Sequence, residues 1–427
     1  MAKKLSSVLG VDIGSRKIKI AEVKAAGKDA VVTAIGMVDT PEGAVDHTGV
    51  YNSDAVGDAL KRVIAESGAS CSHVVVSVAG QASVLVRTIE VPKMNPTELK
   101  EHMQWEINRN IPFAESTVVS DFKPLGGDDP ASQNMDVVMA ISPQSAIDTL
   151  IACVKRSGKQ TAAIDVEPLG LARSVKSSYD DLFGTQSVCI VDVGHKTTSI
   201  NIFKDGKLLM PRTVPVGGEM FTQAISETVG IVGSEAERMK LEDVDLNLVQ
   251  TNSSPTMNPF NPSPSGGDFQ PYNPFADDAS MAPPAPPVED FVPADPDMTA
   301  HASSVYDQPA EEPEPVVTSA PIQPAGDLRA LNAITPVLEE FVAEIRRSID
   351  YFRSRGGEVD RVLVCGGGSK LRGLPEFLGK SLGLPCDAYD PLRRLNISAK
   401  KADLSFVDEH RAEFAVAVGN GLHILFD

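Results

Sequence analysis

Basic residues are too few in this sequence to form the extended positive face of a protein that binds nucleic acid. The chain has 39 Lys+Arg against 58 Asp+Glu, a formal net charge of −19 over 427 residues. Apolar runs are also short: none approaches the roughly 18–20 residues that cross a bilayer, and Asp12 interrupts the stretch that a signal peptide would need. We therefore expect a cytoplasmic protein that binds no nucleic acid and reaches a membrane only through a partner.

Cysteines are few, and none stands in a CxxC pair. Most lie beside strand-like apolar runs, which is typical of buried, reduced thiols in a cytoplasmic protein. The five are Cys71, Cys153, Cys189, Cys365 and Cys386. With 42% hydrophobic and 23% charged residues, the chain otherwise has the composition of a globular protein of two or more domains.

One internal segment lacks Lys and Arg altogether. Residues 251–327 hold 12 of the 58 acidic residues and 17 of the 31 prolines. Such a segment cannot bury enough apolar surface to offset its chain entropy, so we expect a disordered, acidic, proline-rich insertion. It carries −12 of the net charge and leaves −7 for the rest of the chain.

Strand-like and helix-like segments alternate on both sides of this insertion, which is the pattern of an α/β protein. Apolar runs predict strands at 74–78, 137–141, 188–193 and 361–365. Amphipathic periodicity predicts helices at 54–66, 96–109, 144–156, 219–229 and 334–353.

A strand–turn–strand pattern occurs twice, 180 residues apart. VLGVDIGSRKIKIAEV (8–23) aligns with VCIVDVGHKTTSINIF (188–203), so that Asp12 pairs with Asp192. Each copy predicts a β-hairpin whose tip carries an Asp-x-Gly turn. One such turn is ordinary hairpin chemistry, but two in matching strand contexts indicate a shared function.

These tips suit a polyphosphate ligand. Glycine lets the backbone approach an anion closely. Successive turn N–H groups form an anion-binding nest, to which Ser15 or Thr197 adds a hydroxyl donor. An aspartate at the strand end can hold Mg²⁺, which in turn neutralises phosphate. Two facing hairpins would therefore hold a metal–polyphosphate from both sides.

A glycine-rich turn follows the two hairpins in the sequence. RVLVCGGGSKLRGL (361–374) predicts a strand, three glycines and a helix that begins at Ser369. This arrangement lets a ligand approach the backbone at a helix N-terminus, although tight strand–helix packing also requires glycine.

This order of elements resembles the actin/Hsp70/sugar-kinase ATPase superfamily. Within it, the chain resembles the PilM family of pilus assembly proteins, relatives of the cell-division protein FtsA, above all in VPKMNPTELKEHMQWEINRNIPF at 91–113. Further likeness lies in VEPLGLAR (166–173), VPVGGEMFTQAI (214–225), SEAERMK (234–240) and VGNGL (418–422).

The resemblance implies a two-lobed actin-like ATPase fold with duplicated RNase H-like subdomains and an extra small α/β subdomain. The expected divisions are the first lobe core (1–80), the inserted docking subdomain (81–160) and the second lobe core (161–250). The disordered insertion (251–327) follows, and then the rest of the second lobe with a return to the first (328–427).

The resemblance also implies ATP and Mg²⁺ as cofactors, with Asp12 and Asp192 holding the cation through water. It places the phosphates against Gly14, Ser15, Gly194, Thr197, Gly217 and Gly218. The ribose and base would contact Glu237 and Lys240, and Gly366, Gly367 and Ser369 would flank the adenosine.

Glu167 falls where some relatives orient the attacking water, although an acid before Pro168 is also a routine arrangement at a helix N-terminus. Many relatives have a run of glycines at the second hairpin, whereas this chain has His195 and Lys196 after Gly194. We therefore expect ATP binding and, at most, slow hydrolysis.

The helix at 96–109 is predicted to bury Leu99, Met103 and Ile107 and to leave Trp105, the single tryptophan, on its opposite side. An exposed indole is a candidate anchor for a partner, and packing against a neighbouring subdomain is the alternative. The resemblance favours docking of the cytoplasmic N-terminal tail of a PilN-like inner-membrane protein.

The resulting expectation is a nucleotide-responsive scaffold of type IV pilus or related type II secretion assembly, peripheral at the inner membrane. It would contact other pilus assembly proteins, and weak self-association stays open. The alternatives are an FtsA-like filament protein, against which the lack of a membrane-targeting helix after VGNGL counts, and a small-molecule kinase.

Overall fold

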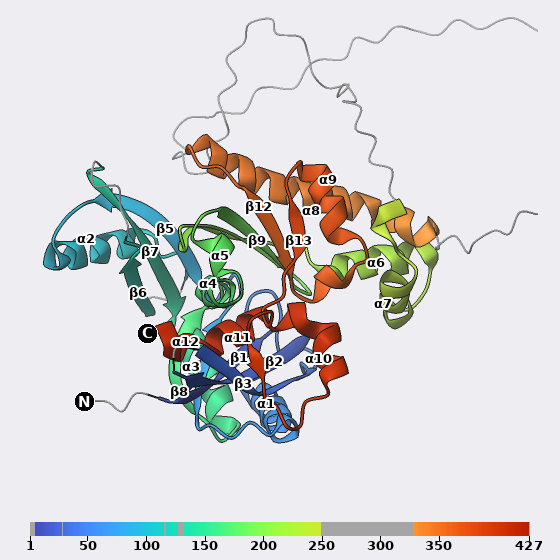
Figure 1. Cartoon of the computed structure of the whole chain (residues 1–427), viewed down its shortest axis with the longest axis horizontal. Helices are drawn as coiled ribbons and strands as arrows, with labels where there is room; N and C mark the ends of the chain where they lie inside the picture. Colours follow the sequence, from blue (N-terminus) through green and yellow to red (C-terminus); the bar gives the residue numbers. More distant parts are fainter. Residues whose placement is uncertain (1–4, 28, 115–116, 127–131, 249–327, 427) are drawn as a thin grey trace, which may run out of the picture. The chain divides into compact units, whose positions relative to one another are not determined.

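The computed structural model describes residues 5–27, 29–114, 117–126, 132–248 and 328–426, which belong to one compact unit (Figure 1). The insertion predicted at 251–327 lies outside the described residues. Within the described ranges, no helix is both long and apolar enough to cross a membrane.

A six-stranded sheet forms the core of the first lobe. Its order is β14 (Asn396–Ile397), β3 (Asp29–Asp39), β2 (Lys17–Ala26), β1 (Ser7–Ile13), β4 (His73–Val78) and β8 (Gln160–Val166). Helices α1 (Ser53–Ser67) and α3 (Gln144–Arg156) pack on one face through apolar side chains. The other face packs against α10 (Leu404–His410) and α11 (Ala415–Gly421).

A five-stranded sheet forms the core of the second lobe. Its order is β11 (Lys207–Val214), β10 (Thr198–Lys204), β9 (Ser187–Val193), β12 (Arg361–Cys365) and β13 (Cys386–Ala388). Helices α6 (Gly218–Val229), α8 (Leu328–Ser354) and α9 (Leu374–Leu382) cover one face. Helix α4 (Glu167–Ser178) packs on the other.

The two sheets repeat one topology. In each, three antiparallel strands are followed by parallel ones, and β1–β2 and β9–β10 occupy the same central places. Asp12 lies opposite Lys19 in the first hairpin, and Asp192 lies opposite Ser199 in the second, again 180 residues apart. The duplication predicted from the sequence repeat is confirmed.

A small third sheet carries the inserted segment. Strands β5 (Leu85–Pro92), β7 (Asn134–Pro143) and β6 (Val118–Pro124) are antiparallel, and α2 (Pro96–Arg109) packs on one face. Asn95 caps α2 and forms a capping box with Glu98, which satisfies N–H groups at the helix start. The helix has the predicted bounds and buries the predicted stripe.

Helix α8 is longer than predicted. The apolar periodicity predicted a helix at 334–353, but the helix begins at Leu328 and includes Pro336 in its interior. The upstream turn forms because Ala330, Leu331 and Ile334 are buried against the second sheet. Tertiary burial here outweighs the local effect of proline.

The remaining described helical segments are short. They are α5 (Asp180–Phe183), α7 (Gly233–Glu242), η1 (Leu246–Leu248), η2 (Gly367–Lys370), η3 (Arg411–Phe414) and α12 (His423–Phe426).

Helices α4 and α11 cross at glycines. A Cβ on Gly419 would lie 1.8 Å from the Gly170 carbonyl oxygen, so only glycine permits this approach. The adjacent Asn420 is fully buried, and its amide donates to the Val11 carbonyl and to the Ser77 hydroxyl at 2.9 and 2.8 Å. The crossing thereby fixes α11 against the strands that end at the first hairpin.

Candidate functional site

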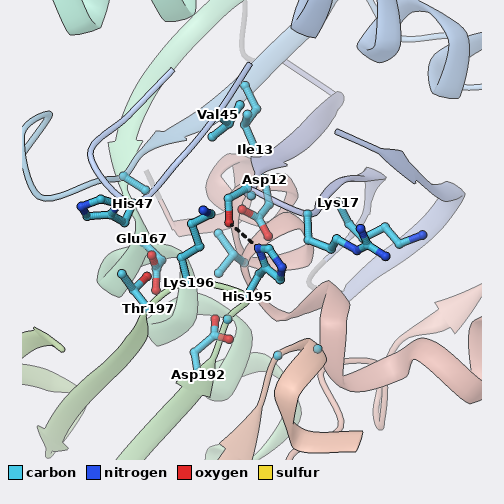
Figure 2. A pocket seen from close by; sticks show the side chains of 18 of the residues that line it. Asp12, Ile13, Lys17, Val45, His47, Glu167, Asp192, His195, Lys196 and Thr197 are labelled. Atoms are coloured by element: carbon cyan, nitrogen blue, oxygen red, sulfur yellow. Dashed lines mark hydrogen bonds between the residues drawn. The ribbon is translucent and has the colours of Figure 1, made fainter. Parts of the chain in front are cut away.

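A cavity of about 380 Å³, here called the cleft, is lined by residues of both hairpins and of both lobes (Figure 2). Most of the residues predicted for nucleotide and metal line it: Asp12, Gly14, Ser15, Glu167, Asp192, Gly194, Thr197, Gly218, Glu237, Lys240, Gly366 and Gly367. Gly217, Ser369 and Trp105 do not. The structure therefore brings residues from five separate parts of the sequence to one place.

The two hairpin turns have the same geometry. The Gly14 N–H donates to the Lys17 carbonyl at 3.1 Å, and the Gly194 N–H donates to the Thr197 carbonyl at 3.0 Å. A Cβ on Gly194 would approach the Thr197 oxygen to 2.7 Å, which explains the glycine. Each turn leaves two residues at its tip, and the Ser15 hydroxyl lies 3.3 Å from the imidazole of His195.

Carboxylates gather where the hairpins face each other. Burial, and then the neighbouring Glu167 and Asp12 carboxylates, raise the pKa of Asp192 to about 8. Burial likewise raises the pKa of Glu167, which accepts a hydrogen bond from the Ser199 hydroxyl. Buried carboxylates that lie near one another are stabilised in their charged form when a cation lies between them.

Lys19 supplies one such cation, and the analysis of the sequence missed it. Its Nζ donates to Asp12 Oδ2 at 2.7 Å. Burial opposes its charge, but the Asp12 carboxylate raises the pKa of Lys19 above its ordinary value. The hairpin register was the available signal, since pairing the strands around Gly14 places Lys19 directly opposite Asp12.

These residues fit a bound divalent cation. Mg²⁺ is held in proteins by one or two carboxylates, with water and phosphate oxygens completing its shell. Asp12 and Asp192 offer two carboxylates at equivalent strand ends, and a cation between them would offset the burial and the neighbouring carboxylates that raise the pKa of Asp192. Among the described residues, no group of three or more His, Cys, Asp or Glu side chains is arranged as a metal site.

Helices α6 and α7 contribute a buried polar cluster. Lys240, only 5% exposed, donates to the Gly218 carbonyl at 3.1 Å, the Thr222 hydroxyl at 2.8 Å and Glu237 at 2.8 Å. Burial opposes ionisation of Glu237, but the Lys240 charge lowers the pKa of this acid. Thr222, which was not predicted, completes the cluster by donating to Glu237 at 2.5 Å.

The glycine-rich turn borders the cleft through its main-chain atoms and not through the Ser369 hydroxyl. Gly366 has φ 82°, and a Cβ there would lie 2.2 Å from Asp192 Oδ1, so this position requires glycine. The Ser369 hydroxyl donates to the Gly366 carbonyl at 2.6 Å and therefore stabilises the turn itself. Lys370 does line the cleft and pairs with the buried Glu413 at 2.9 Å.

Gly217 and Gly218 occupy different places at the start of α6. A Cβ on Gly217 would lie 2.4 Å from the His195 carbonyl oxygen, so this glycine lets α6 approach the second hairpin. Gly218 lies inside the cleft, where a Cβ would be within 4 Å of Gly194, Lys240 and Gly368. The absence of a side chain at Gly218 leaves room for a ligand beside the Lys240 amine, which would attract a phosphate.

A second cavity of about 430 Å³, here called the groove, lies where the small sheet adjoins the first lobe. Its lining includes Val119 and Phe122 of β6, Ala140 of β7 and Asp165 of β8. Asp165 pairs with Arg173 of α4 at 2.5 Å. Apolar walls around a few polar groups are typical of a peptide or small-molecule site.

Trp105 lies on α2, outside both cavities. Its side chain is 57% exposed, as predicted, and the Arg109 guanidinium lies 5.3 Å from the centre of its ring. His102 lies on the same side, with its ring centre 6.2 Å away.

Comparison with known protein families shows to which family the chain belongs. The model of the type IV pilus assembly protein PilM matches residues 10–262, which include both hairpins and the small subdomain. The chain belongs to the PilM family. The model of the cell division protein FtsA matches residues 189–419, so this PilM-family chain is also related to FtsA through its second lobe.

Curated relatives are similar at low identity. The cell division protein FtsA of Neisseria meningitidis is 23% identical over 254 residues, 54% of this chain and 60% of that protein. FtsA of Bacillus subtilis is 32% identical over 97 residues, 23% of this chain and 21% of that protein. The PilM-family chain thus spans at most about 60% of the length of these relatives.

Solved structures confirm the actin-like, two-lobed fold. A PilM–PilN type IV pilus biogenesis complex has a TM-score of 0.72 at 22% identity and covers 99% of both chains. The ethanolamine utilization protein EutJ from Carboxydothermus hydrogenoformans has a TM-score of 0.50 at 12% identity, covering 98% of this chain and 91% of that one.

Proposed function

We propose that this PilM-family protein is a nucleotide-binding scaffold of the type IV pilus assembly machinery. In this proposal it captures the cytoplasmic N-terminal segment of a PilN-like inner-membrane protein, and Mg-ATP in the cleft modulates that capture. The observation that carries the proposal is the cleft itself, in which two equivalent acid-tipped hairpins face each other beside a glycine-rich turn.

The geometry supports a nucleotide in a defined orientation. The hairpin turns and Gly218 would receive the phosphates, with Asp12 and Asp192 toward the cation that accompanies them. The base and ribose would lie toward Lys240 and Gly367. When bound, the cation would supply the positive charge that offsets triphosphate and carboxylates together.

Glu167 already has a hydrogen-bond partner in the cleft. Burial raises its pKa, and the Ser199 hydroxyl donates to its carboxylate. Because Ser199 competes with an attacking water for this carboxylate, the contact supports slow hydrolysis at most. The proposed scaffold needs binding and closure of the cleft, a population shift between two arrangements of the lobes.

Two surfaces are available for the partner segment. The Trp105 side of α2 offers a rigid exposed aromatic with a neighbouring cation. The groove offers apolar walls and an unpaired sheet edge at β6, to which an extended peptide could add as a strand. We propose Trp105 as the anchor. The groove is the alternative binding site, and the test below distinguishes the two.

The test is a titration of the full chain with a labelled copy of the PilN-like N-terminal segment, with and without Mg-ATP. We expect saturable binding whose affinity changes when Mg-ATP is added. Absence of binding in both conditions would overturn the scaffold role, and identical affinities would overturn nucleotide modulation.

Two variants then locate the surface. Trp105→Ala removes the exposed indole, and Val119→Arg places a charge at the groove, where Val119 is 39% exposed. Both positions are solvent-facing, so each folded protein should be retained. Loss of binding in Trp105→Ala alone supports the proposed anchor, whereas loss in Val119→Arg alone moves the site to the groove.

A filament-forming protein is the second candidate, favoured by the FtsA model match over 189–419. Sedimentation of the full chain with Mg-ATP separates the two. Nucleotide-dependent pelleting supports filament formation, and a protein that stays in the supernatant supports the scaffold.

A further inference from the structure

The two hairpins carry different residues at one pair of equivalent positions, Ser15 and His195, whose side chains meet across the cleft. Ser15 and His195 are related by the 180-residue repeat, and Ser15 Oγ lies 3.3 Å from His195 Nδ1. Figure 2 shows the imidazole directed toward the first hairpin. A titratable ring therefore occupies the space between the tips.

A phosphate held by both tips would have to enter between these two side chains. A charge-assisted donor stands about 2.7–2.9 Å from a phosphate oxygen. Donors on opposite sides of one phosphate are then farther apart than the 3.3 Å seen between Ser15 and His195. The pair must open when a terminal phosphate arrives.

Charged groups face the His195 ring from four elements. Glu219 of α6 lies 3.9 Å from Nε2, Lys196 follows on the same tip, Arg16 comes from the first hairpin, and Glu237 comes from α7. Burial lowers the pKa of His195, and the two neighbouring cations lower it further. The two carboxylates raise it, but the resulting pKa is still below the ordinary value of histidine. The ring is therefore neutral at neutral pH in this structure.

We propose that His195 is the residue by which the cleft distinguishes a nucleoside triphosphate from a diphosphate, by parting from Ser15 and taking up a proton as the terminal phosphate enters. The inference rests on the proposed nucleotide site. The terminal phosphate brings negative charge against the imidazole and favours its charged form. A diphosphate does not reach the tips and leaves the pair closed.

Proton uptake determines the sign of the pH dependence. At His195 the triphosphate-bound cleft holds one more proton than the cleft without it, so this residue makes triphosphate affinity rise as the pH falls through neutrality. The nucleotide's own phosphates and Asp192, which would lose its proton to a bound cation, also titrate, but their contributions are the same in every His195 variant. His195→Gln retains hydrogen bonding without titration and so isolates the histidine.

The experiment is calorimetry of Mg-ATP and Mg-ADP binding to the full chain at about pH 6 and about pH 8, each in two buffers of different ionisation enthalpy. Between about pH 8 and about pH 6, the ratio of ATP affinity to ADP affinity should rise about tenfold more in the wild type than in His195→Gln. ATP binding should take up about one proton more in the wild type than in His195→Gln. His195→Gly, measured alongside, should behave like His195→Gln.

Lys196→Gln is the matched control, because it removes a fixed charge from the same tip. It should weaken Mg-ATP at both pH values, and it should leave Mg-ADP affinity and proton uptake unchanged. Equal affinity ratios and equal proton uptake in the wild type and both His195 variants would overturn the inference. Failure of the wild type to bind either nucleotide would overturn the nucleotide site, and this inference with it.

Discussion

At the scale of single residues, the cleft depends on charges that compensate one another. Lys19 is the cation nearest to Asp12, and Asp192 and Glu167 lie close enough to alter each other's ionisation. The acids at 12 and 192 could be predicted from the repeat. Lys19 could have been found from the strand register, whereas Glu413 could not, because its place beside Lys370 depends on how distant segments pack.

Replacement of Lys19 by Met should destabilise the protein in the absence of ligand. The change leaves Asp12 without its partner, and the two side chains are 14 and 18% exposed. We expect a loss on the order of 2 kcal/mol in the free energy of unfolding, between the values typical of exposed and fully buried pairs. Urea denaturation measures it.

Lys17→Met is the matched control, two residues away on the same strand. Lys17 pairs with Asp39, whose side chain is 71% exposed, so its loss should cost less than about 1 kcal/mol. Equal losses in the two variants would contradict the assigned role of Lys19.

The raised pKa of Asp192 predicts a pH dependence of stability. The folded protein binds a proton at Asp192 up to about pH 8, whereas an ordinary aspartate has a pKa of 3.8. Between these values the folded state holds more protons than the unfolded state, so this contribution to stability falls as the pH rises, by at most about 1.4 kcal/mol per pH unit.

Asp192→Asn removes this titration. Its unfolding free energy relative to the wild type should therefore rise between about pH 5 and about pH 8. Urea midpoints for both proteins at each pH measure the difference. Parallel curves across this range would show that Asp192 ionises normally in the folded state.

At the scale of elements, local signals predicted α2 to the residue but placed the start of α8 too late. The capping residue, the proline and the apolar stripe of α2 all agree. In α8, Pro336 conflicts with burial of the preceding turn, and burial decides the outcome. Sequence reasoning sees the proline, while the sheet that buries Ala330 and Ile334 is known only from the fold.

Helix α2 offers a contrast between packing and exposure. Met103 is fully buried against the small sheet, and Trp105 is 57% exposed. Met103→Ala should lower the free energy of unfolding by about 2–5 kcal/mol. Trp105→Ala should change it by less than about 0.5 kcal/mol while weakening capture of the partner segment. Equal effects on stability would place Trp105 in a packing role.

The crossing of α4 and α11 should tolerate no side chain. Gly419→Ala would put a Cβ 1.8 Å from the Gly170 oxygen, and overpacking of this kind costs about 1–3 kcal/mol. The control is Gly233→Ala at the start of α7, where a Cβ meets nothing within 4 Å. Thermal unfolding of both proteins tests the crossing, and an unchanged Gly419→Ala midpoint would refute it.

At the scale of the whole molecule, one duplicated unit explains the cleft. Two sheets of the same strand order present equivalent hairpins, and their tips meet at equivalent residues. The α/β class and the hairpin pair could be predicted because they leave local or repeated patterns, whereas the small subdomain was expected from the family resemblance. The groove could not be predicted, since it arises where β6, β7, β8 and α4 meet, and how these elements pack against one another is known only from the fold.

Calorimetric titration of the full chain with Mg-ATP, in the wild type and in Asp12→Asn, Asp192→Asn and the double variant, tests the joint action of the hairpins most directly. Each single change should weaken binding at least about tenfold, and the double change should add little, because both acids serve one cation. A wild type that binds nothing, or variants that bind as the wild type does, would contradict the account.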